Sequence, residues 1–185
     1  MSDEDDLQLL QAKQALQRGD MQAATSILLD AMKYEGKKAA AAYSLGIAYD
    51  MDSAFQNTDL AVEYYSIAES LGSDIATYRI AGVQQRSGNF VEAIERFKRI
   101  SDSNPSAAYW CYRLIKDVNP SDPQVEIFRD KGASQGHVLA KRDILIEGLK
   151  GKKGIRRMFT SAFGIVKLFH EIKTAAAEKN EILYQ

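Results

Sequence analysis

The residue types that most often carry catalytic or metal-binding chemistry are few in this chain. Its 185 residues include two histidines, His137 and His170, and one cysteine, Cys111. A Ser–His or Cys–His nucleophile needs both groups in one site, and the two histidines are 33 positions apart. One cysteine and two histidines also fall short of the usual zinc sites. We therefore expect no metal and no other cofactor.

A phosphate-binding loop is also not expected. Gly148, Gly151 and Gly154 lie among lysines, but no strand precedes them and the Gly-Lys-Ser/Thr sequence does not follow. His137, in a turn before a helix, suits a solvated or capping role. Cys111 suits a small buried side chain in a helix. The sequence thus predicts a protein that is not an enzyme.

The composition is that of a globular chain, and the length suits one domain. Hydrophobic residues make up 45% and charged residues 26%, and 24 Lys and Arg oppose 25 Asp and Glu for a net charge of −1. A general nucleic-acid binder normally carries a basic excess, so we do not expect this function. The acidic start Met1–Asp6 is the reverse of a secretory signal, no apolar run has the length of a membrane span, and a single thiol suits a reducing compartment. We expect a cytoplasmic protein.

The segment Ala76–Ser101 reads as a helical hairpin. Apolar residues recur at spacings of three and four in two blocks, one before and one after Ser87–Asn89. Gly88 can end the first helix and Asn89 can cap the second.

This pattern repeats along the chain. Similar hairpins are expected over Gln17–Met32 and Ala41–Ala68, and the offsets Ala61 to Ala93 and Ala68 to Ile100 are both 32 residues. Looser offsets of 31 and 33 residues continue the period toward Ala140. A period in the low thirties with helix-turn-helix content is typical of stacked α-hairpins.

Ser87–Phe97 resembles the turn and second helix of a tetratricopeptide repeat, and Ala41–Gly72 and Gly132–Ala140 are similar to the Sel-one-like variant. The resemblance covers about residues 7–150. The sequence departs from the repeat pattern at two places. Residues 118–123 interrupt the fourth hairpin, and Met51–Thr58 lengthens the second turn. The resemblance implies an all-α, right-handed superhelix of about five helix-turn-helix repeats, which binds peptides or proteins and performs no chemistry.

An Ala-x-Tyr pattern marks a candidate partner-binding groove. Tyr43, Tyr78 and Tyr109 occupy equivalent points of successive first helices, and tyrosine is enriched at recognition surfaces. In the alternative interpretation, the three rings wedge between neighbouring repeats. The polar neighbours expected on the same face are Asp50, Gln85, Arg86, Arg113 and Lys116.

The carboxyl-terminal quarter has a different pattern. Between Lys141 and Arg157, seven cations oppose two carboxylates for a local charge of +5, whereas the first six residues carry −4. The following residues 158–172 are apolar over more than half of a helical circumference. This helix is interpreted in three ways. It can be the second helix of the last repeat, buried by the preceding hairpin and by the tail Thr174–Gln185 folding back; a protein interface, either a homodimer seam or a docking surface for a partner; or a surface on an anionic membrane. The residues expected at an interface or membrane are Lys152, Lys153, Arg156, Arg157, Phe159, Phe163 and Phe169.

The sequence predicts four segments: an acidic tip at 1–6, helical repeats at 7–150, a basic and then Phe-rich capping helix at 151–173, and a tail at 174–185. The predicted function is a non-catalytic scaffold or adaptor that binds a peptide or protein in the groove. The alternative is a peripheral membrane-associated assembly factor that docks through the Phe-rich helix. Neither the partner nor the oligomeric state follows from the sequence.

Overall fold

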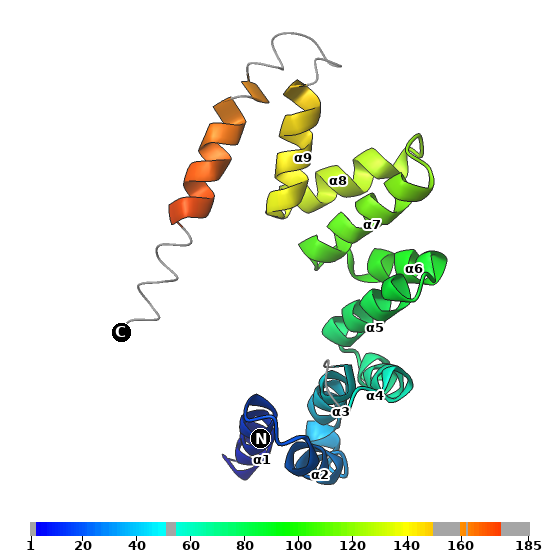
Figure 1. The fold of residues 1–185 in the computed structure, drawn as a ribbon, viewed down its shortest axis with the longest axis vertical. Helices are drawn as coiled ribbons and strands as arrows, with labels where there is room; N and C mark the ends of the chain where they lie inside the picture. Colours follow the sequence, from blue (N-terminus) through cyan, green and yellow to red (C-terminus); the bar gives the residue numbers. More distant parts are fainter. Residues whose placement is uncertain (1–2, 51–54, 150–159, 162, 175–185) are drawn as a thin grey trace. The chain divides into compact units, whose positions relative to one another are not determined.

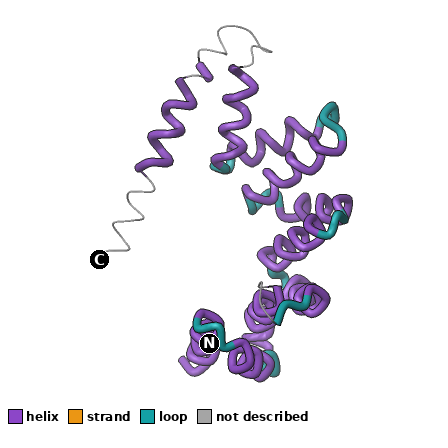
Figure 2. Tube along the Cα trace, in the orientation of Figure 1, coloured by secondary structure: helices purple, strands orange, loops and turns teal. Residues whose placement is uncertain are grey.

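The computed structural model describes residues 3–50, 55–149, 160–161 and 163–174. Helices joined by short turns account for all regular structure in these ranges, and none of them contains a strand (Figure 1 and Figure 2). The all-α prediction is therefore confirmed for the described part of the chain.

The chain divides into two compact units, Met1–Ile100 and Ser101–Gln185. The division falls inside the range predicted for the repeats. The first unit contains α1 (Asp3–Gln17), α2 (Met21–Ala31), α3 (Glu35–Asp50), α4 (Thr58–Ser70), α5 (Asp74–Arg86) and α6 (Phe90–Ile100). The second contains α7 (Pro105–Val118), α8 (Gln124–Ser134) and α9 (Val138–Leu149), followed by the helical residues 160–161 and 163–174.

The hairpin expected at Ala76–Ser101 is confirmed as α5 and α6. Gly88 turns the chain between them at a φ of 81°, a left-handed conformation that glycine adopts without a steric penalty. The Asn89 amide then donates to the Gln84 carbonyl at 2.9 Å, which closes a Schellman turn. The same geometry separates α1 from α2, where Gly19 has a φ of 76° and the Asp20 amide donates to the Ala15 carbonyl at 3.0 Å.

Side-chain caps set where several helices begin. Asp20, Asn57 and Ser73 each accept a hydrogen bond from the backbone amide three residues ahead, at the starts of α2, α4 and α5. Asn104 caps α7 in the same way, and Pro105 occupies the first turn, where its missing N–H costs nothing. The repeat boundaries thus follow from local sequence chemistry.

The core of the first unit depends on small residues. α3, α4 and α5 pack around the ring of Tyr65, which is fully buried. A Cβ atom added at Gly46 would lie 2.3 Å from Tyr65 Cδ1, so α3 approaches α4 more closely than any other residue would allow. The remaining buried members of this cluster are Ala42, Ala61, Ala68, Ala76 and Ile80.

The second unit is built around α7. Cys111 is fully buried in this helix, as the sequence predicts. The interruption expected at 118–123 forms the link between α7 and α8, since α7 ends at Val118 and α8 begins at Gln124. The other buried residues of α7 are Ala107, Ala108, Tyr109, Tyr112, Leu114 and Ile115.

The helical segment after α9 lies against α9 along one line of residues. Ser161 and Leu168 are buried, and a Cβ atom at Gly164 would lie 2.6 Å from Leu145 Cδ2. The boundary expected near residue 150 and the tail after residue 174 lie outside the described residues.

Candidate partner-binding site

A polar pocket of about 280 Å³ lies between α7 and α9, the first helices of successive hairpins in the second unit. Its walls carry aromatic, cationic and acidic side chains from both helices. They are Tyr112, Arg113, Lys116, Asp117, Arg142, Asp143, Ile146 and Glu147. A pocket lined by convergent polar groups on first helices is where a helical-repeat protein can hold a partner.

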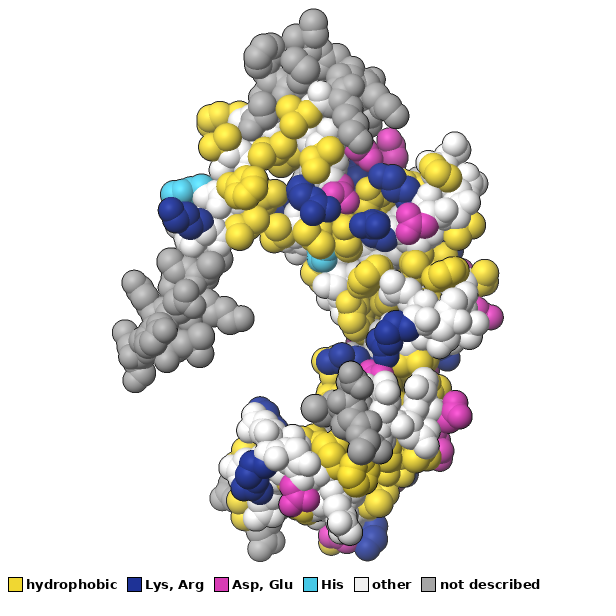
Figure 3. Space-filling view, viewed as in Figure 1, with side chains coloured by type: hydrophobic (Ala, Val, Ile, Leu, Met, Phe, Trp, Pro, Cys, Tyr) yellow, Lys and Arg dark blue, Asp and Glu magenta, His cyan; other side chains and the backbone are white. Residues whose placement is uncertain are grey.

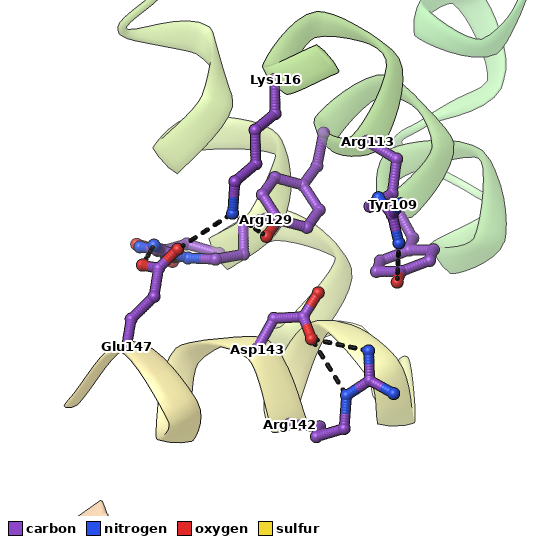
Figure 4. Close-up of polar contacts among 9 residues, drawn as sticks. Tyr109, Arg113, Lys116, Arg129, Arg142, Asp143 and Glu147 are labelled. Carbon is purple, nitrogen blue, oxygen red and sulfur yellow. Dashed lines mark hydrogen bonds and ion pairs between the residues drawn. The ribbon is translucent and has the colours of Figure 1, made fainter. Parts of the chain in front are cut away.

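One wall of the pocket is a charged network that includes a buried arginine. The Arg129 side chain is only 5% exposed and forms ion pairs with Glu147 and, at 2.7 Å, with Asp130. Lys116 donates to Glu147 at 3.3 Å and to the Tyr112 hydroxyl at 2.8 Å (Figure 4). The network therefore ties α7, α8 and α9 together.

Burial and hydrogen bonding shift the pKa of both members of the Tyr112–Lys116 pair. Burial raises the pKa of the Tyr112 hydroxyl, although the Lys116 ammonium acts against this. The hydrogen bond to Tyr112 raises the pKa of Lys116, and Glu147 adds to this effect. At neutral pH the pair thus consists of a neutral phenol and a firmly protonated ammonium.

The other wall presents two guanidinium groups. Arg142 donates to Asp143 from Nε at 3.0 Å and from Nη2 at 2.8 Å. Arg113 donates to the Tyr109 hydroxyl at 3.4 Å, a long bond to a neutral acceptor (Figure 4). A guanidinium group is the preferred donor to a carboxylate or phosphate, so this wall has the chemistry to bind an anionic or hydrogen-bond-accepting group.

Tyr109 supports this wall from below the surface. It is 4% exposed, and its ring stacks on His137 with centroids 4.3 Å apart. Of the two interpretations of the tyrosine pattern, the wedged one therefore holds at this position. The His137 ring also accepts a 3.4 Å hydrogen bond from the Ala140 amide, which confirms its capping role, and burial lowers the pKa of His137.

Five other predicted groove residues lie in the first unit, and of these Asp50 and Arg86 form an ion pair with each other. Tyr43 is half-buried, with its ring 5.9 Å from that of Tyr65, and Tyr78 is half-buried against Phe97. Asp50 accepts a 2.7 Å hydrogen bond from the exposed Arg86. Gln85 is half-buried. Partner binding by these residues stays a prediction.

Four residues of this region were not predicted from the sequence: Arg129, which pairs with Glu147, and the lining residues Tyr112, Asp143 and Glu147. The last two were counted only as minor charges within a basic run, although their spacing of four places them on one face of a helix. Arg129 carries no local signal, because its role depends on a contact with a residue 18 positions away.

The predicted carboxyl-terminal residues divide into two groups. Lys152, Lys153, Arg156, Arg157 and Phe159 lie outside the described residues. Phe163 and Phe169 are 76% and 71% exposed, and the tail that was expected to cover this helix lies outside the described residues after residue 174.

The described residues offer neither a metal site nor a membrane span. These residues contain no cluster of three or more His, Cys, Asp and Glu side chains placed to hold a metal ion. They also include no helix with the length and apolarity needed to cross a membrane.

The comparisons with known proteins give a fold and no family. No family model matches the chain, and no curated protein matches it in sequence. A solved structure entitled "MamA RS-1 ArsTM double mutant" is similar over 96% of this chain and 99% of that chain, with a TM-score of 0.62 and 16% sequence identity. This similarity confirms the predicted fold class, an all-α superhelix of helical hairpins.

Proposed function

We propose that this chain is a non-catalytic scaffold that binds a protein or peptide partner in the pocket between α7 and α9. The observation that carries the proposal is the guanidinium wall of this pocket, where the hydrogen bond of Arg113 to Tyr109 is 3.4 Å long. Helical-repeat folds of this kind typically serve protein interaction and not catalysis. We place the scaffold in the cytoplasm, in keeping with its single buried thiol.

The charged wall of the pocket, opposite the guanidinium wall, is already ordered before a partner binds. Arg129, Glu147 and Lys116 hold three helices in place through ion pairs that do not require a ligand. Binding of a partner therefore requires little loss of conformational entropy in the protein. The two guanidinium groups then supply directional hydrogen bonds to an accepting group of the partner.

Co-purification of the tagged full chain from its native cells tests this proposal. Arg113→Glu combined with Arg142→Glu should reduce recovery of the bound protein by about tenfold or more, since it reverses both guanidinium charges. The matched control is Lys13→Glu with Arg18→Glu, which changes the net charge equally at two exposed cations of the first unit. Recovery that is unchanged in the pocket variant, or lost equally in the control, would contradict the assignment.

A second function is favoured by a separate observation. Phe163 and Phe169 are exposed on the segment after α9, next in sequence to the basic residues 150–157. This arrangement supports a membrane-associated scaffold that docks through its carboxyl-terminal helix. The pocket and the helix use different residues, so one chain can perform both functions.

A further inference from the structure

The helical segment 160–174 has a fixed orientation on α9. Gly164 and Leu168 line the cavity against α9, and Ser161, three positions before Gly164 on the same side of the helix, is also buried. Gly164 lies so close to Leu145 that a side chain at position 164 would have to displace the Leu145 side chain. One face of the segment therefore packs against α9, and this contact determines which side chains lie on the opposite face.

The opposite face is apolar and exposed. Phe163 is 76% exposed, Val166 68%, Phe169 71% and Ile172 43%. Exposed apolar side chains gathered on one face of a helix mark a contact with another apolar phase.

Cationic side chains accompany this patch. Lys167 and Lys173 each follow a phenylalanine by four positions, Phe163 and Phe169, which places them beside these rings on the helix surface. Lys167 and Lys173 are both exposed. Lys167 also lines the cavity against α9, together with Glu171, the one carboxylate of the segment. In Figure 3, hydrophobic, basic and histidine side chains lie side by side on the described part of this segment.

The charge distinguishes between two possible occupants of the patch. Residues 141–173 contain nine Lys and Arg but three Asp and Glu, a net charge of +6. A symmetric dimer through this helix would pair two segments of the same positive net charge, and like charges disfavour association. An anionic lipid surface instead offers opposite charge to the lysines and an apolar layer to the phenylalanines.

We propose that the face formed by Phe163, Val166, Phe169 and Ile172 docks on an anionic membrane surface. The phenylalanines enter the boundary between headgroups and acyl chains, while Lys167 and Lys173 remain at the lipid phosphates. α9, held against the opposite face, keeps the helix parallel to the surface. This inference deepens the second function and is independent of partner binding in the pocket between α7 and α9.

The experiment measures sedimentation of the full chain with phosphatidylcholine vesicles, with and without phosphatidylserine, at low ionic strength. The chain should bind only the vesicles with phosphatidylserine. Phe163→Asp with Phe169→Asp should weaken binding by about tenfold or more, since two large apolar side chains no longer insert. Val91→Asp with Val118→Asp is the matched control, because both valines are similarly exposed (72% and 70%) on other helices.

A second pair of variants tests the cations. Lys167→Glu with Lys173→Glu should also weaken binding, and more than the Lys13→Glu, Arg18→Glu control does. The pocket variant Arg113→Glu, Arg142→Glu should bind vesicles as that control does, so a failure of the pocket and a failure of the membrane face remain distinguishable. Circular dichroism verifies that each variant is folded.

Three outcomes would overturn the proposal. The first is no binding to phosphatidylserine vesicles at low salt. The second is binding that the phenylalanine variant leaves unchanged. The third is a dimer in light scattering that Phe163→Asp with Phe169→Asp converts to a monomer, without vesicle binding, since a second copy would then cover the face.

Discussion

Two buried tyrosines show how the two units differ. Tyr65 in the first unit is fully buried, and its hydroxyl lies 3.5 Å from Asp50, which is at the limit of a hydrogen bond. Tyr112 in the second unit is 1% exposed, but its hydroxyl accepts a 2.8 Å hydrogen bond from Lys116. Burial raises the pKa of both, yet the neighbouring carboxylate adds to the shift of Tyr65, while the ammonium opposes that of Tyr112.

The difference indicates that the units are stabilised in different ways. In the first unit, close packing of small residues around an aromatic ring dominates. In the second, a charged network extends from the buried Arg129 to the pocket surface. A closely packed core is sensitive to added volume, whereas a charged network is sensitive to the loss of one charge that leaves its buried partner unpaired. The predictions below test this contrast.

Gly46→Ala should have the largest effect. The added methyl group would lie 2.3 Å from the Tyr65 ring, so α3 and α4 must separate, which should lower the free energy of unfolding by about 3 kcal/mol. Urea denaturation measures the loss. Gly82→Ala is the control, because its Cβ would meet only Arg86 Nη1 at 3.7 Å. That variant should gain about 0.5 kcal/mol from helix propensity, and an equal loss in both variants would contradict the packing argument.

Glu147→Ala should have the next largest effect, and it acts on the second unit. It removes an ion-pair partner from Arg129, whose side chain is 5% exposed, and should cost about 2 kcal/mol. Asp130→Ala, at a partner that is 60% exposed, should cost about 0.5 kcal/mol. Equal losses in thermal denaturation would show that the network does not depend on burial.

Removing the two phenolic hydroxyls compares the units directly. Tyr112→Phe should cost about 1 kcal/mol, because Lys116 loses a good hydrogen-bond acceptor. Tyr65→Phe should change the free energy of unfolding by less than about 0.5 kcal/mol. The Tyr65 hydroxyl, which this variant removes, lies 3.5 Å from Asp50 and so forms at most a weak hydrogen bond. The reverse order, measured by urea denaturation, would refute the comparison.

The smallest expected effect is a pH dependence at His137. Burial lowers its pKa in the folded state below the ordinary 6.5, so the unfolded state binds a proton more readily. His137 should therefore reduce stability as the pH falls below about 6.5, and have no effect above it. The drop in melting temperature between neutral and mildly acidic pH should be smaller in His137→Gln. An identical drop in both proteins would exclude this role.

The sequence predicted the hairpins well because their signals are local. The turn at Ser87–Asn89 contains both a glycine in the left-handed region and the start of the next helix, and periodic apolar residues identify α5 and α6 on either side. Burial of Cys111 and the capping role of His137 were also expected from local context.

The pocket was predicted less completely because it depends on contacts between distant residues. Arg113 and Lys116 were assigned to a groove, but Glu147 on α9, which pairs with Lys116 and with Arg129 on α8, was not. Tyr109 was expected on an exposed surface or wedged between repeats, and only the stacking on His137 decides between the two. The exposure of Phe163 depends in turn on which side of its helix Gly164 presents to Leu145.

The position of Cys111 makes the kinetics of the second unit observable without any added label. It is the one thiol in the sequence and is fully buried in α7. A thiol reagent can react with it only when α7 becomes exposed, so the labelling rate reports how often this unit opens. The first unit contributes no signal. Occupation of the pocket between α7 and α9 by a partner should therefore slow the labelling of the native protein.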